Sequence, residues 1–227
     1  KCLRMQGKCL YYIKRYDEAW MLMNQALDIA IQIDNKKQIV ACHKQLYYLC
    51  REFKRMMNER GDEQASTLFF RESLLHEMYF SEKPRLAELT VRYEALRCDI
   101  MQQYYMNKDY DNVIRIATSL DIHDDADPNA SCLVYYYKAQ AYVKLENYPM
   151  AKEAFFREFE LRKKYLGWEE EDTILACQNL GVLYSFCNER EEALACFREA
   201  YGHEVKKNGE DSEMAQKLLQ YISVVES

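Results

Sequence analysis

The chain has 227 residues, of which 49% are hydrophobic and 30% are charged, and its formal net charge is −6 at pH 7. This amount of apolar material suits a folded core and excludes a disordered chain. The negative charge argues against a nucleic-acid partner, because phosphate binding draws on clustered Lys and Arg, and it favours a basic or neutral ligand. With only six Gly and three Pro, the sequence lacks the turns that a fold of many short strands requires, so we expect an all-helical protein.

The cysteines and the apolar segments bear on the compartment. Nine cysteines, an odd number, form no CxxC pair, which is typical of a reducing compartment. No apolar run approaches the length of a membrane span and no secretory signal opens the chain, so we expect a cytoplasmic protein with no membrane partner. The helical pattern is already under way at Lys1, and we therefore expect the chain to be part of a longer protein.

The first predicted helical hairpin spans residues 1–35. Gly7 and Leu10 lie on its first helix, and Ala19 and Met23 lie on its second. The absence of a side chain at Gly7 lets the second helix approach closely, and Ala19 meets the same need from the other side. Leu10 and Ala19 are nine residues apart.

The second predicted hairpin, residues 36–83, is the least regular. Its apolar residues predict an extended first helix; they are Leu46, Leu49, Phe53 and Met56. Ala65 and Phe69 fit its second helix. The first helix also carries a basic run that glutamates interrupt, and we interpret this run as a solvated helix face. Its residues are Arg51, Lys54, Arg55 and Arg60.

Three further hairpins are predicted at residues 84–127, 128–168 and 169–208, followed by a cap helix within 209–227. The nine-residue interval returns from Tyr104 to Val113, from Tyr142 to Ala151 and from Tyr184 to Ala193. Ala139 and Gly181 repeat the small residue at Gly7. A single hairpin leaves an apolar face uncovered and is stable only when it is stacked on its neighbours. We therefore predict one array of about five hairpins with a C-terminal capping helix.

Signals for helix ends support these boundaries. Pro84 and Pro149 stand where a helix begins, and Asp172 or Thr173 and Asp211 or Ser212 are predicted N-caps. The acidic segment 121–127 lacks the glycine and the terminal glutamate of a calcium loop. We interpret it as a loop that caps the helix after Pro128, and we expect no metal.

With these residues in view, the sequence resembles the tetratricopeptide repeat family over essentially the whole chain. Its last part, from Leu166-Gly167 through Asn179-Leu180-Gly181 to Ala200, resembles the longer repeats of kinesin light chains. Trp168 and three glutamates depart from that pattern, which usually has His-Pro in this loop. The resemblance implies a right-handed α-solenoid whose first helices line a concave groove, and such a groove usually accepts an extended peptide or a partner helix.

The resemblance also implies which residues line the groove. These are Arg4, Lys8, Tyr11, Gln102, Tyr105, Tyr136, Gln140, Gln178, Asn179 and Val182. Asn179 holds the place where the family often has an asparagine that hydrogen-bonds the ligand backbone. Chaperone-binding members capture a C-terminal carboxylate with basic residues, but Cys98 and Gln102 stand at two of those places. We therefore do not expect carboxylate capture.

Our first hypothesis for the function is a scaffold or adaptor that binds a protein or peptide in the groove. The alternative is a peptide-sensing regulatory domain of a larger transcription regulator or enzyme, and a third is the recruiting arm of an enzyme whose site lies elsewhere. The sequence has no phosphate-binding loop, dinucleotide fingerprint or nucleophile elbow. His76-Glu77 lacks the second histidine of a zinc-protease motif, since position 80 is Phe80. We expect no enzymatic activity and no cofactor, and the step from fold to binding rests on the family resemblance.

Overall fold

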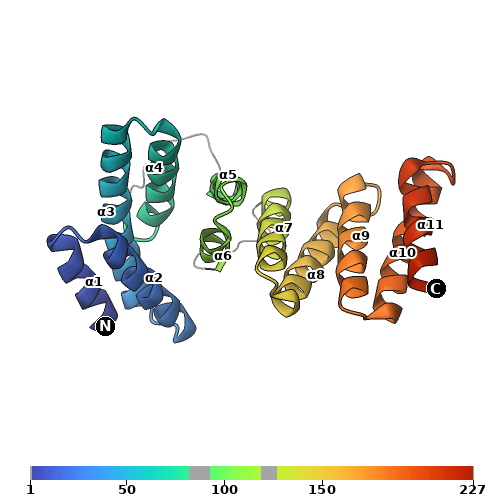
Figure 1. Ribbon diagram of the computed structural model, residues 1–227, viewed down its shortest axis with the longest axis horizontal. Helices are drawn as coiled ribbons and strands as arrows, with labels where there is room; N and C mark the ends of the chain where they lie inside the picture. Colours follow the sequence, from blue (N-terminus) through green and yellow to red (C-terminus); the bar gives the residue numbers. More distant parts are fainter. Residues whose placement is uncertain (1, 82–92, 119–126, 227) are drawn as a thin grey trace. The chain divides into compact units, whose positions relative to one another are not determined.

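The computed structural model describes residues 2–81, 93–118 and 127–226, which are helical almost throughout and contain no strand (Figure 1). The prediction of an all-α fold is confirmed for these residues. The chain forms two compact units, residues 1–107 with 118–121 and residues 108–117 with 122–227. The single uninterrupted array stays a prediction.

The first unit contains five described helices. They are α1 (Cys2–Tyr12), α2 (Tyr16–Gln32), α3 (Lys36–Arg60), α4 (Glu63–Glu77) and α5 (Tyr93–Met106). The 25 residues of α3 confirm the extended first helix of the second hairpin. The apolar faces of α1, α2 and α3 meet in a core that includes Ala19, Met23, Leu27, Leu46 and Leu49. Pro84 lies outside the described residues.

The second unit contains six described helices. They are α6 (Tyr110–Thr118), α7 (Pro128–Lys144), α8 (Tyr148–Tyr165), α9 (Glu171–Phe186), α10 (Arg190–Asn208) and α11 (Glu213–Glu226). From α7 to α11 each helix packs against the next, and Leu218 of α11 closes the core over α10. The cap helix is confirmed. Each helix in the described residues is too short or too polar to cross a membrane.

Close helix crossings hold the hairpins together, as the small residues predict. A Cβ atom added to Gly7 would lie 2.9 Å from Met23 Cε, and one added to Gly181 would lie 2.8 Å from Phe197 Cε1. On the facing helix Ala193 is completely buried. At Gly181 a methyl group does not fit against the aromatic ring, whereas at Gly7 it would displace the end of the Met23 side chain.

The nine-residue interval has its origin in the backbone. At the first turn the N–H of Arg15 donates to the carbonyl of Leu10, and four residues later the N–H of Ala19 donates to the carbonyl of Arg15, both at 3.0 Å. The first bond spans five residues and the second spans four, which together give the nine residues from Leu10 to Ala19. Lys14, with φ 62°, supplies the left-handed residue that such a helix end requires.

The same two bonds fix the alignment of the second hairpin. There Asp62 donates to Met57, and Ser66 donates to Asp62, with Gly61 in the left-handed conformation. The residue equivalent to Ala19 is therefore Ser66, which is buried. Ala65 lies on α4 as predicted, but it is one residue out of alignment.

The helix caps agree with the sequence in two cases out of three. Ser212 Oγ accepts from the N–H of Ala215 at 3.1 Å, and Asp127 Oδ1 accepts from the N–H of Ala130 at 3.2 Å, so both predicted caps are confirmed. The prediction of Asp172 or Thr173 is wrong. Helix α9 starts after Glu170, whose carbonyl accepts from the Thr173 N–H, and Asp172 instead accepts from Arg162. The rest of the acidic segment, 121–126, lies outside the described residues.

A buried ion pair joins two residues of α8, and its arginine also reaches a carboxylate on α9. Arg162 Nε lies 2.8 Å from Glu158 Oε1, and Arg162 Nη1 lies 3.1 Å from Asp172 Oδ2. Burial raises the pKa of the Glu158 carboxyl to about 7, although the charge of Arg162 acts to lower it.

Replacing Gly181 by Ala tests the crossing. We expect a net loss of about 1–2 kcal/mol in the free energy of unfolding, because overpacking outweighs the gain in helix propensity. The Phe197 ring has no room to move, since it is buried and stacked on Tyr221. The control is Gly202→Ala on α10, where an added Cβ meets nothing within 4 Å and stability should rise by up to about 1 kcal/mol. Equal effects in denaturant unfolding would contradict the close crossing.

The Glu158 carboxyl predicts a dependence of stability on pH. The folded state holds this proton more tightly than the unfolded chain, whose ordinary value is 4.5, so its contribution to stability is lost as pH rises from 4.5 to about 7. Relative to Glu158→Gln, which is neutral throughout, the wild type should lose up to about 3 kcal/mol over this range. The control is Glu160→Gln, at an exposed position. If the difference in free energy of unfolding between the wild type and Glu158→Gln does not change with pH, the raised pKa is ruled out.

Candidate functional site

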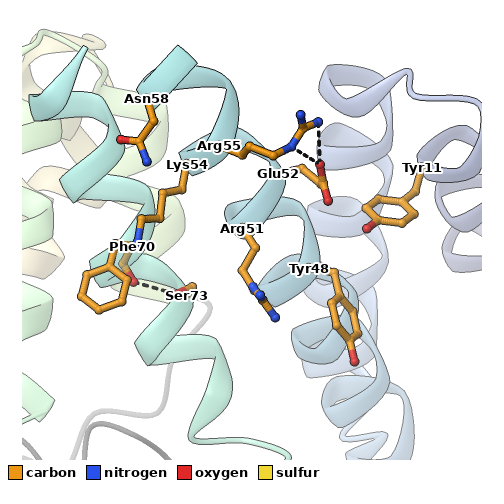
Figure 2. Close-up of a pocket in the computed structure, with 9 residues that line it drawn as sticks. All are labelled: Tyr11, Tyr48, Arg51, Glu52, Lys54, Arg55, Asn58, Phe70 and Ser73. Atoms are coloured by element: carbon orange, nitrogen blue, oxygen red, sulfur yellow. Dashed lines mark hydrogen bonds and ion pairs between the residues drawn. The ribbon is translucent and has the colours of Figure 1, made fainter. Parts of the chain in front are cut away.

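A pocket of about 470 Å³ opens in the first unit between α1, α3 and α4. Figure 2 shows that the long helix α3 supplies most of its wall, with one tyrosine from α1 and two residues from α4. The lining residues are Tyr11, Tyr48, Arg51, Glu52, Lys54, Arg55, Asn58, Phe70 and Ser73.

The spacing along α3 explains why its residues share the wall. Lys54 and Arg55 come three and four residues after Arg51, and Asn58 comes four and three residues after them, which places all four along one side of a helix. Helix α3 has 25 residues, and those of its residues that line the pocket fall in its second half, from Tyr48 to Asn58. The pocket therefore depends on the same irregularity that set the second hairpin apart in the sequence.

The pocket lies at a crossing that lacks the usual small residue. In the turn, Met57 corresponds to Leu10 of the first hairpin. Gly7 stands three residues before Leu10, and Lys54 stands three residues before Met57. On the facing helix, Ser66 corresponds to Ala19, and Phe70 therefore corresponds to Met23. The Lys54 Nζ atom lies 4.4 Å from the centroid of the Phe70 ring. A cation over an aromatic face thus replaces the contact that Gly7 and Gly181 make in the first and last hairpins.

The charges at the pocket are mainly positive. Arg55 forms ion pairs with Glu52 at 3.1 Å and with Glu59 at 2.8 Å. The Arg51 guanidinium lies 5.7 Å from the Tyr47 ring and points into the open pocket in Figure 2. Three basic side chains therefore face one lining carboxylate, in a chain whose net charge is negative.

The aromatic residues give the pocket apolar surface and a phenol group. Tyr11 and Tyr48 lie on one side and Phe70 on the other (Figure 2). Burial, followed by the nearby Glu52 charge, raises the pKa of the Tyr11 hydroxyl. A tyrosine hydroxyl is protonated at neutral pH even at its ordinary pKa of 10.0, so Tyr11 is able to donate a hydrogen bond.

The structure changes our interpretation of the basic run. Arg51, Arg55 and Arg60 are exposed, as a solvated face would be, and Lys54 is half-buried. Three of the four nevertheless line the pocket. The sequence contained a signal for this, because tyrosines precede the run and Lys54 stands at the position of the crossing glycine.

Of the groove residues predicted in the first unit, Tyr11 lines the pocket. Arg4 donates from Nε to Gln38 Oε1 at 3.2 Å, and Lys8 Nζ lies 5.8 Å from the Tyr12 ring. Gln102 is exposed and Tyr105 is half-buried, both on α5. The structure thus includes one of these five residues in the pocket, and the sequence missed the α3 residues that form most of it.

The groove residues predicted in the second unit lie on α7 and α9. Tyr136 packs against the core and its ring contacts Phe155, while Gln140 and Asn179 are half-buried and Val182 is exposed. Gln178 is only 4% exposed, so a ligand does not reach its side chain in this arrangement. Asn179, one residue later, is the more accessible amide.

No protein-family model matches the chain, and no curated protein matches its sequence. Among solved structures it is similar to BtubC (BKLC) from P. vanneervenii, with a TM-score of 0.55 and 13% sequence identity. The likeness covers 92% of this chain and 82% of that chain. At this identity the comparison concerns the fold alone. The chain has an all-α helical-repeat fold.

Proposed function

We propose that this chain is a tetratricopeptide-like protein-interaction scaffold and that the pocket between α1, α3 and α4 holds an acidic segment of a partner protein. The observation that carries the proposal is the gathering of three basic and three aromatic side chains around one pocket. Helical repeats bury their core between hairpins and leave such surfaces to partners.

The chemistry of the pocket favours a carboxylate next to an apolar side chain. The Arg51 guanidinium offers two parallel N–H donors that match a carboxylate, and charge-assisted bonds of this kind are stronger than neutral ones. Tyr11, Tyr48 and Phe70 offer rigid contact area that costs little conformational entropy. This local charge reverses the expectation of a basic or neutral ligand, which rested on the charge of the whole chain.

We propose Gln140, Asn179 and Val182 of the second unit as a further contact surface. Their support is the family resemblance together with their partial or full exposure on α7 and α9. Asn179 offers both a donor and an acceptor for a peptide backbone. Tyr136 contributes to the core and is a weaker candidate.

The pocket can be tested by selecting peptides from a randomised display library with the full chain as bait. We expect the selected peptides to be enriched in Asp or Glu beside an aromatic or aliphatic residue. The Arg51→Glu, Lys54→Glu variant should bind them at least about tenfold more weakly, because it removes charge-assisted hydrogen bonds worth about 1.5–3 kcal/mol.

The matched control is Lys36→Glu, Lys37→Glu, which makes the same change in charge at exposed positions on the same helix. It should retain the wild-type affinity. The proposal fails if the selected peptides are not enriched in acidic residues, or if both double variants lose affinity equally. The latter result would mean unspecific attraction between charges. Asn179→Ala, measured with the same peptides, reports on the second surface.

A further inference from the structure

A group of metal-binding residue types lies buried in the first unit, away from solvent. Cys50 on α3 and Glu72 and His76 on α4 are each 0% exposed. One ligand atom from each of the three lies within 4.8 Å of the others. A thiol, a carboxylate and an imidazole thus converge on one point inside the protein.

Helix geometry brings these residues together. Glu72 and His76 are four residues apart and share one face of α4, with His76 Nε2 3.6 Å from Glu72 Oε1. Arg51 and Ser73, which line the pocket, directly follow Cys50 and Glu72, and successive residues on a helix are about 100° apart. The buried group and the pocket therefore occupy different faces of the same two helices.

A second layer of side chains orients the imidazole and the carboxylate. His43 Nδ1 lies 2.9 Å from His76 Nδ1, and the His43 ring is stacked on Tyr79 with centroids 3.7 Å apart. The Tyr104 hydroxyl donates to Glu72 Oε2 at 2.6 Å. These contacts use His76 Nδ1 and Glu72 Oε2, and so leave His76 Nε2 and Glu72 Oε1 directed towards each other. Residues around a metal site commonly orient its ligands in this way.

We propose that Cys50, Glu72 and His76 bind a zinc ion, through Cys50 Sγ, Glu72 Oε1 and His76 Nε2. Two anionic ligands balance the charge of Zn²⁺, and the sulfur and nitrogen atoms favour zinc over magnesium or calcium. His76 then carries its proton on Nδ1 and donates it to His43 Nδ1. Zinc with three protein ligands commonly takes water as its fourth ligand.

The distances fit a site that contracts slightly on binding. Ligands at about 2.0–2.3 Å from a tetrahedral zinc ion lie about 3.3–3.8 Å apart. The 3.6 Å between His76 Nε2 and Glu72 Oε1 is already in this range. The bound ion would connect α3 to α4 and so stabilise the two helices that form most of the pocket.

Cobalt titration of the full chain, stripped of metal with a chelator, tests the site. Cobalt is a spectroscopic substitute for zinc, and we expect one ion per chain. Its spectrum should show the visible bands of a tetrahedral site and an ultraviolet thiolate-to-cobalt charge-transfer band, and zinc should displace it. Less than stoichiometric binding by the wild type would overturn the proposal. This readout involves no peptide, so its failure is distinguishable from failure of the proposed pocket.

A matched pair of variants identifies the thiolate. Cys50→Ser should remove the charge-transfer band, whereas Cys42→Ser should keep it. Cys42 is also buried on α3, and burial raises the pKa of its thiol to about 11, so it remains protonated. A band that persists in Cys50→Ser would refute the site. If either serine variant does not fold, as judged by circular dichroism, the stoichiometry and the next two variants decide.

Two further variants test the carboxylate and the outer layer. His43→Phe should weaken cobalt binding by about 10- to 100-fold while keeping the charge-transfer band, since it removes an orienting partner and not a ligand. Glu72→Gln keeps the shape of the side chain but removes its charge, and it should weaken binding by at least as much. Unchanged affinity in both variants would mean that the buried group is only a hydrogen-bonded core.

Discussion

The close approach of paired helices is the constraint on which the rest of the structure depends. A Cβ atom at Gly181 would not fit against the Phe197 ring, and one at Gly7 would displace the end of the Met23 side chain. The backbone bonds of the turn set the nine residues between the crossing positions of the two helices. Once the turn and the crossing are fixed, the direction of every side chain on both helices follows from the helix period.

The second hairpin shows what happens when this constraint is relaxed. It keeps the turn but has Lys54 and Phe70 at the crossing, and Phe53 and Phe69 stack nearby with centroids 5.0 Å apart. Larger side chains and an extended α3 then shape both the pocket and the buried polar group. The hairpin that fits the repeat pattern least well carries both of the sites that we propose.

The sequence predicted the fold well because the fold depends on local patterns. Helix pairs, the cap helix and the caps at Asp127 and Ser212 follow from residues a few positions apart. The site was harder to predict, since a helix turns about 100° per residue and an error of one residue moves a side chain from groove to core, as at Gln178. Cys50 and His76 come from different helices 26 positions apart, so no short motif indicates that they meet.

The left-handed turn has a consequence for how such a chain can change during evolution. Lys14, Gly61, Glu146 and Asn188 hold the same backbone conformation in turns of the same length. An insertion or deletion there would shift one helix of the pair against the other and separate the small residues that must meet. Among the described links between hairpins, the one from α2 to α3 repeats this turn with Asp34 in the left-handed conformation, whereas the one from α8 to α9 is built differently. Gains and losses in length are therefore expected at the joints that lack this turn, such as the one between α8 and α9, and duplication or loss of sequence is expected to proceed by whole hairpins.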